Sequence, residues 1–340
     1  MSKFQNLADL MGSGENSENS ENSENSENSK DSKAEDFALE PDGRYQLSAT
    51  TVRDTSNYVS DVLRDGFAGR SAREFPLLVV GWGKCRVGST AMTNLFGIAG
   101  IPAFYQPVKT IARHRLVGQA GSPWQLPEGE GVLFAKEMAG PYVHYEAVFN
   151  PVECLLNAGW PAERIHLLVL DREPRASLSS WINKWQDRIG RERVVENFVL
   201  SSLNYSRMRS FADRAGVPTT HFPYEASRAP EATVGRMFDR IGIPDRYQES
   251  ILTGWGERGD LNSANSKVVH PVEPEPYVVP GLHGAGDAYR FQQRSHADLS
   301  AGELAAADGV RDAYEESVRR CVEDLDISAE LAGKLFQLER

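Results

Sequence analysis

The stretch FPLLVVGWGKCRVGST, residues 75–90, decides the fold of this chain. Its first half is a short apolar run closed by glycines, the pattern of a strand buried on both faces of a parallel sheet. After a tight turn, apolar residues recur at helical spacing, which predicts a helix from Thr90 to Gly97. A strand, a turn and a helix in this order offer backbone N–H groups at a helix N-terminus, where an anion can bind. The sequence therefore predicts an anion site at this turn.

Beyond the turn, apolar runs and helical patterns alternate along the chain. Further strands are expected at residues 131–138, 164–170 and 218–224. Further helices are expected at residues 152–158, 175–185, 194–215 and 230–241. This alternation predicts an α/β fold of three layers, in which a central parallel sheet is flanked by helices.

The two ends of the chain differ from its middle in composition. Residues 1–40 contain an uninterrupted Glu-Asn-Ser repeat without an apolar face, so we expect a disordered acidic tail there. Residues 41–70 are expected to form a linker and an N-terminal helix, and residues 71–340 one domain that would hold any catalytic site. Within that domain, residues 254–300 are rich in Gly, Pro, Asn and His, which predicts a lid or long loop before the helical residues 300–338.

The net charge of -11 is concentrated in the tail. Residues 1–40 hold three lysines and ten carboxylates, a net of -7, which leaves -4 for the other 300 residues. A domain that is only mildly acidic overall is not expected to bind nucleic acid or an anionic membrane surface. Any anion must therefore be captured by a local group of cations.

Cysteine usage and hydropathy indicate the compartment. The three cysteines show neither paired nor metal-ligand spacing, so no disulfide framework and no metal site are expected. No apolar run approaches the roughly 18–20 residues of a membrane span, and the N-terminus lacks the order of a signal peptide. These features favour a cytoplasmic protein without a membrane span.

The turn departs from a nucleoside triphosphate loop at one position. A Walker A loop reads Gly-x4-Gly-Lys-Ser/Thr, and Ser89 stands here where that loop has its lysine. The anion cradle is kept while the side chain that contacts terminal phosphates is missing, and Arg86 lies inside the turn instead. The residues expected around the phosphate are Lys84, Arg86, Val87, Gly88, Ser89 and Thr90.

A second motif lies in the run LVLDREPRASLSSW, residues 168–181, where Arg172, Pro174 and Ser180 follow an apolar strand. An arginine offers a planar fork of donors to a phosphate, and a proline pre-organises the start of the next helix. Together the two motifs resemble those of the sulfotransferases that use 3′-phosphoadenosine 5′-phosphosulfate (PAPS), a family of the P-loop superfamily. The family's first motif, Lys/Arg-Ser-Gly-Ser/Thr-Thr, matches residues 86–90 at four of five positions.

This resemblance covers about residues 75–245, including residues 222–225, which are similar to the family's Tyr-Glu-Asp stretch. It implies a P-loop-like strand-loop-helix that binds the 5′-phosphosulfate, with Arg172 and Ser180 on the 3′-phosphate. The C-terminal third has no recognisable match. There, Arg258-Gly259 and Arg290 are weak substitutes for the family element that closes over the nucleotide.

The resemblance also implies a reaction, the transfer of a sulfuryl group from PAPS to a hydroxyl or amine of a small-molecule or carbohydrate acceptor, without a metal. Arg86 would stabilise the leaving 5′-phosphate, and Lys136 would contact the sulfuryl group. Gln106 stands where many members have a catalytic glutamate, and glutamine is no base. Glu137 is therefore the first candidate for the general base, with His114 and His144 as alternatives.

Two other functions compete with this interpretation. A nucleotide-dependent phosphotransferase needs a Walker lysine and an acidic magnesium ligand, and Asp171 alone fits the second requirement. A non-catalytic nucleotide-binding protein is the other, because Gln106 occupies a position where a base is expected.

Overall fold

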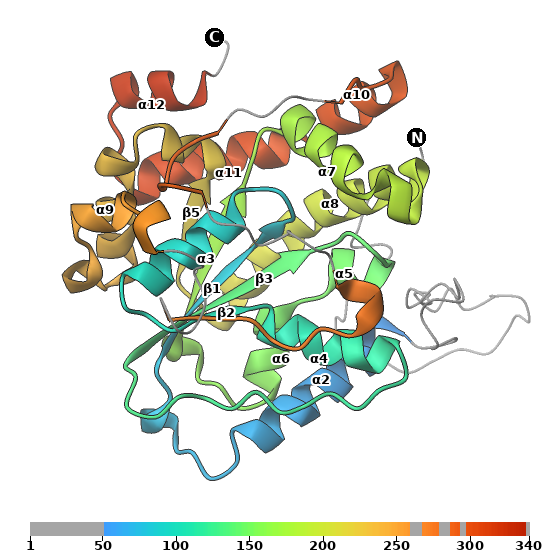
Figure 1. Ribbon diagram of the computed structural model, residues 1–340, viewed down its shortest axis with the longest axis vertical. Helices are drawn as coiled ribbons and strands as arrows, with labels where there is room; N and C mark the ends of the chain where they lie inside the picture. Colours follow the sequence, from blue (N-terminus) through green and yellow to red (C-terminus); the bar gives the residue numbers. More distant parts are fainter. Residues whose placement is uncertain (1–50, 259–266, 279–285, 293–296, 338–340) are drawn as a thin grey trace, which may run out of the picture.

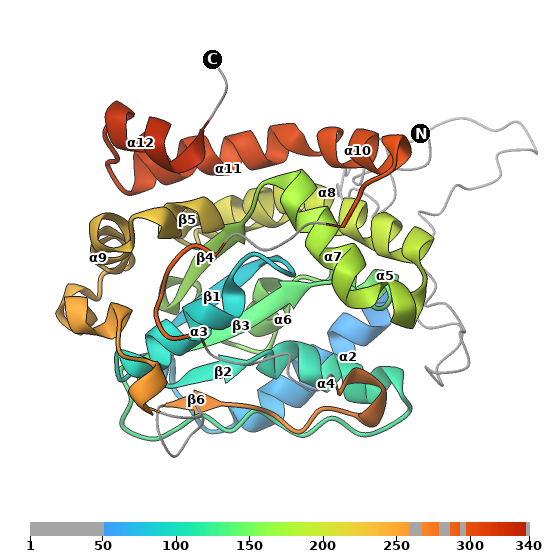
Figure 2. The same cartoon turned by 45° about the horizontal axis from the view of Figure 1, so that its top comes forward.

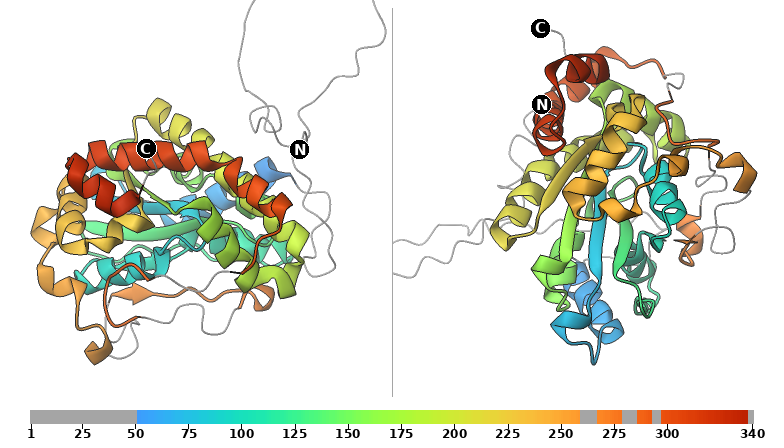
Figure 3. Two further views of the ribbon diagram at one scale, coloured as in Figure 1. Left: turned by 90° about the horizontal axis from the view of Figure 1, so that it is seen from above. Right: turned by 90° about the vertical axis from the view of Figure 1, so that its left-hand side faces the viewer.

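A six-stranded parallel sheet with the strand order β5-β4-β1-β3-β2-β6 forms the centre of the computed structural model (Figure 1). The structure describes residues 51–258, 267–278, 286–292 and 297–337, so the expected tail lies outside the described residues. Helices cover the sheet on both sides (Figure 3). The α/β class and the parallel sheet predicted from the sequence are confirmed.

Four of the six strands lie where the apolar runs placed them. The strands are β1 (Leu77–Lys84), β2 (Ala103–Tyr105), β3 (Val132–Ala139), β4 (Ile165–Asp171), β5 (Thr219–Pro223) and β6 (Val268–Val269). β1 is central and pairs with β3 on one side and with β4 on the other. β2 and β6 were not predicted, because strands of three and two residues carry no periodic signal.

Alternation along β1 divides the core into two layers. Leu78, Val80 and Trp82 pack with one group of helices, whereas Val79 packs with the other. The first group comprises α2 (Val52–Gly66), α4 (Pro107–Leu116), α5 (His144–Val148), α6 (Pro151–Asn157), α7 (Pro174–Ile189) and α8 (Arg191–Ala215). The second comprises α3 (Ser89–Ile98), α9 (Pro230–Ile241), α11 (Arg311–Asp324) and α12 (Ala329–Phe336). α10 (Ala301–Asp308) packs against α7 and α8 (Figure 2).

Side-chain caps fix where several of these helices begin. Thr51 forms a capping box with Asp54 at the start of α2, and Glu173 accepts a hydrogen bond from the Ala176 amide at the start of α7. α3 begins at the N-cap Gly88, and no side chain caps it. No helix among the described residues is long and apolar enough to cross a membrane.

The connections that follow the neighbouring strands β1 and β3 run on opposite faces of the sheet. The chain runs from β1 through α3 in one layer, whereas it runs from β3 to β4 through α5 and α6 in the other. β3 and β4 are the two neighbours of β1, so the carboxyl end of β1 is a topological switch point. Open α/β sheets bind ligands at such points, outside the carboxyl ends of their strands.

The approach of β1 to β4 predicts a steric limit at Gly83. A Cβ atom there would lie 1.9 Å from the backbone oxygen of Leu170. We expect Gly83→Ala to lower the free energy of unfolding by about 1–3 kcal/mol, measured by urea denaturation. Gly131→Ala is the matched control, since a Cβ at Gly131 meets nothing within 4 Å. Equal stability of the two variants would contradict this packing.

Candidate functional site

A pocket of ≈ 480 Å³ opens at the carboxyl ends of the strands. Five strands contribute residues at or just after their ends. These are Cys85 and Arg86 after β1, Tyr105 and Gln106 at β2, Lys136 and Met138 on β3, Arg172 after β4 and His270 after β6. The pocket therefore lies at the switch point that the topology indicates.

The charge of the pocket is opposite to that of the chain. Its described lining contains six cationic side chains, from Arg86, Arg113, Lys136, Arg172, Lys184 and Arg290. One carboxylate, that of Glu273, lies among the same lining residues. A concave site with this surplus attracts anions although the whole chain carries a net charge of -11.

The turn between β1 and α3 forms one wall of this pocket. Arg86 and Gly88 both adopt left-handed backbone conformations, with φ of 68° and 78°. A Cβ at Gly88 would lie 2.4 Å from a ring carbon of Tyr224, so glycine is needed there on two counts. Ser89 and Thr90 line the pocket at the uncapped start of α3, where N–H groups of the first turn have no intrahelical acceptor. Val87 is buried in the core instead.

The two sequence motifs meet on this wall. Arg86 Nε donates a hydrogen bond to Ser180 Oγ at 3.1 Å. Arg172 Nη1 donates to the Arg86 carbonyl oxygen at 3.1 Å, and its guanidinium lies over the Tyr224 ring, with Cζ 5.2 Å from the centroid. Lys184, one helical turn after Ser180, also lines the pocket. Partial burial lowers the pKa of Lys184, and the charge of Arg86 lowers it further.

Lys84, expected near the phosphate, has a different position. Its ammonium forms an ion pair with Asp171, both side chains are buried, and neither residue lines the pocket. Asp171 Oδ1 also accepts a hydrogen bond from the Arg172 amide at 2.7 Å. The placement of Lys84 corrects the expectation of a direct phosphate contact, because the strand alternation turns its side chain toward the layer that holds Trp82.

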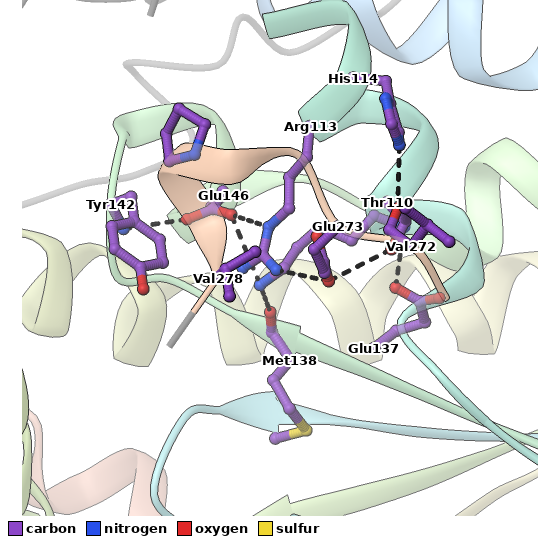
Figure 4. Close-up of polar contacts among 12 residues, drawn as sticks. Thr110, Arg113, His114, Glu137, Met138, Tyr142, Glu146, Val272, Glu273 and Val278 are labelled. Atoms are coloured by element: carbon purple, nitrogen blue, oxygen red, sulfur yellow. Dashed lines mark hydrogen bonds and ion pairs between the residues drawn. The ribbon is translucent and has the colours of Figure 1, made fainter. Parts of the chain in front are cut away.

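Glu137, the first candidate for the base, is also placed outside the pocket lining. Its two carboxylate oxygens accept hydrogen bonds from the amides of Val108 and Lys109, at 2.7 and 3.1 Å, and so anchor the start of α4 (Figure 4). Burial raises the pKa of Glu137 to about 8. The side chain is fully buried and does not line the pocket, which argues against the expected role as the base.

Lys136, expected to contact the transferred group, lines the pocket. Its Nζ lies 4.3 Å from the centroid of the Tyr105 ring, and the side chain is only 6% exposed. Burial, assisted by the charges of Lys109 and Arg113, lowers the pKa of Lys136 to about 7. Its charge therefore changes near neutral pH.

The two histidine candidates do not line the pocket, and a third histidine does. The ring nitrogens of His114 lie 3.0 Å from Gln119 Oε1 and from the Val272 carbonyl oxygen, and Figure 4 shows the second contact. His144 lies 3.6 Å from a carboxylate oxygen of Glu196. His270 lines the pocket and stacks on Tyr105, with ring centroids 4.3 Å apart. Sequence reasoning missed His270, because it follows a strand of two residues inside a Gly- and Pro-rich segment.

Two described parts of the expected lid form the remaining walls. Residues 267–278 attach to the sheet through β6, and Arg113 Nη1 donates to Glu273 Oε1 at 2.8 Å (Figure 4). Residues 286–292 contribute Arg290, and the Gln292 amide donates to the Tyr224 hydroxyl at 2.9 Å. The other segment expected to contact the nucleotide was Arg258-Gly259. Gly259 and the side chain of Arg258 lie outside the described part of the chain.

Comparisons of the chain with protein-family models, with curated proteins and with solved structures found no match to any of them. The function of the pocket must therefore be inferred from the residues that line it.

The pKa of Lys136 predicts how anion binding depends on pH. A lysine with a pKa of about 7 loses its charge as the pH rises, and its protonated fraction falls about fivefold between pH 7 and 8, so we expect pyrophosphate affinity to fall by up to about fivefold. Lys136→Arg keeps the charge over this range and removes that part of the pH dependence. Isothermal titration calorimetry of both proteins measures the difference, which cancels the titration of pyrophosphate itself. Identical slopes would show that Lys136 does not titrate in this range.

Proposed function

We propose that this protein is a PAPS-dependent sulfotransferase, which transfers a sulfuryl group to a small-molecule or carbohydrate acceptor. The observation that carries the proposal is the hydrogen bond from Arg86 to Ser180, with Arg172 bonded to the Arg86 carbonyl oxygen. Two motifs that resemble the family's phosphate-binding motifs thereby share one wall of a cationic pocket. A ligand with phosphate groups at two positions matches such a wall better than a single phosphate does.

In this proposal the turn of residues 86–90 binds the 5′-phosphosulfate through the N–H groups at the start of α3. Arg172 and Ser180 bind the 3′-phosphate. Tyr224 lies beside both groups, since its ring packs on Gly88 and under the Arg172 guanidinium. Residues 286–292, with Phe291 4.9 Å from Tyr224 between ring centroids, form the wall against the nucleoside.

Sulfuryl transfer requires an in-line nucleophile and stabilisation of charge on the leaving phosphate. Arg86 and the N-terminal dipole of α3 stabilise the 5′-phosphate as the bond from its oxygen to sulfur breaks. Lys136, on the strand beside β1, contacts the sulfuryl oxygens. Its low pKa rises when a dianionic group binds next to it, so the lysine takes up a proton as the donor arrives.

The structure gives less support to a phosphotransferase. A phosphotransferase needs a carboxylate for magnesium, but Asp171 is buried in an ion pair with Lys84 and does not line the pocket. The Walker lysine is replaced by Ser89. A non-catalytic nucleotide-binding protein shares every binding feature of the proposal, and only a measurement of turnover distinguishes it.

The assignment of Arg172 to the 3′-phosphate predicts a loss that depends on the ligand. We expect Arg172→Ala to weaken 3′-phosphoadenosine 5′-phosphate by about 10–100-fold, the effect of one charge-assisted hydrogen bond group. Binding of 5′-AMP, which lacks the 3′-phosphate, should change little. Calorimetry with both ligands measures the two effects, and Arg53→Ala, at an exposed position on α2, is the matched control.

The unaltered protein should prefer 3′-phosphoadenosine 5′-phosphate to ATP in the same measurement. Tighter binding of ATP, or an equal loss of both adenosine ligands in Arg172→Ala, is the result that defeats the assignment. Transfer of labelled sulfate from PAPS to a panel of alcohols and phenols then separates an enzyme from a binding protein.

A further inference from the structure

Three side chains from neighbouring strands form a row across one wall of the pocket. The pairing of β2 with β3 places Tyr105 opposite Lys136. The pairing of β2 with β6 places Phe104 opposite Val269, so the next residues in parallel register are Tyr105 and His270. All three side chains of the row line the pocket. Lys136, Tyr105 and His270 therefore face one ligand from three adjacent strands.

The row is packed closely around its central ring. The Lys136 ammonium lies 4.3 Å from the Tyr105 centroid, and the His270 ring stacks on Tyr105 with planes 22° apart. Stacking restricts the orientation of the imidazole without protonating it. The histidine is thus held in place at the pocket wall while the cation occupies the position nearer to β1.

Several other acid–base groups near the pocket are held by contacts within the protein. Both oxygens of Glu137 accept backbone hydrogen bonds, and Glu273 accepts one from Arg113. Three cations, Arg86, Arg113 and Arg172, stay protonated at all relevant pH values. Among the described lining residues, His270 is the histidine, and histidine most often serves as a general base near neutral pH.

We propose, resting on the sulfotransferase function above, that His270 is the general base and that the acceptor is a hydroxyl compound rather than a protonated amine. The row places His270 on the opposite side of Tyr105 from Lys136, the residue assigned to the sulfuryl group, and both side chains line the same pocket. The surplus of cations in the lining disfavours an ammonium group on the acceptor, whereas it stabilises an oxygen nucleophile as that oxygen loses its proton.

The step is balanced without any further reactant. The acceptor oxygen forms a bond to sulfur, and its proton passes to the neutral imidazole of His270. The bond from sulfur to the 5′-phosphate oxygen breaks, and its electron pair stays on that oxygen. The products are the sulfate ester, 3′-phosphoadenosine 5′-phosphate and a histidinium that returns its proton to solvent.

Electrostatics assign different protonation states to the two ends of the row. Partial burial lowers the pKa of His270, and the charge of Lys136 lowers it further, which keeps the imidazole neutral at pH 7. The bound sulfuryl donor has the opposite effect on Lys136, because an adjacent anion favours the ammonium form. Two groups in one pocket with different protonation states are suited to separate tasks, one as the base and the other as a source of positive charge.

The test compares two phenols of similar shape and different acidity. With labelled PAPS as donor, we expect His270→Gln to lower sulfation of para-cresol by about 10²–10⁴-fold, the usual contribution of a general base. Sulfation of para-nitrophenol, which is largely ionised at the assay pH, should fall far less. A purely structural role of His270 would lower both rates together. The protonated amine para-methylbenzylamine should receive no label from the unaltered protein.

The matched control is His114→Gln, because His114 contacts the same segment at Val272 but does not line the pocket. It should show no selective loss with para-cresol. Parallel losses for both phenols in His270→Gln, or rapid labelling of the amine, overturn the inference while the sulfotransferase proposal stands. If the unaltered protein does not bind 3′-phosphoadenosine 5′-phosphate, or binds it and labels no hydroxyl compound, the proposed function fails and the inference fails with it.

Discussion

The buried ion pair between Lys84 and Asp171 joins the two strand ends on which the pocket is built. Their side chains are 6% and 7% exposed, so each charge depends on the other, and removal of one partner of such a pair typically costs about 3–5 kcal/mol. Asp171 also accepts the Arg172 amide, and Arg172 in turn donates to the carbonyl oxygen of Arg86. One set of polar contacts thus runs from the core to the anion-binding wall. Because β1 pairs with β4, the two motifs that follow these strands lie close together in space.

Much of the fold was predictable from the sequence, because four strands coincide with continuous apolar runs. The turn after β1 and the second motif were predictable for the same reason, since each follows one of these runs. Lys84 and Glu137 were both expected in the site, but neither side chain lines the pocket, because each points to the other side of its strand. Neighbours on a strand point to opposite sides, so Lys136 and Glu137 could not both reach one pocket. That rule was available from the sequence once β3 was recognised.

The rest of the site depends on contacts between distant segments that have no local pattern. β2 and β6 are too short for a periodic signal, yet their register is what brings Tyr105 and His270 together. Arg113 reaches Glu273 across 160 residues of sequence. Such contacts arise from the order of the strands in the sheet. To predict that order from the sequence, one would need to know that β6, which follows residue 258, lies at the edge of the sheet.

The positive charge of the pocket could not be predicted from the sequence either. Its six cationic side chains come from separate segments rather than from one run of basic residues. Like charges in one pocket repel, and the structure limits that repulsion in two ways. Arg113 is bonded to the buried carboxylate of Glu146 at 2.7 Å and to Glu273, whereas burial lowers the pKa of Lys136 to about 7. The lysine is therefore only partly charged at neutral pH, and an arriving anion completes its protonation. Anion binding and proton uptake are linked at this position, which favours ligands with a high density of negative charge over single weak anions.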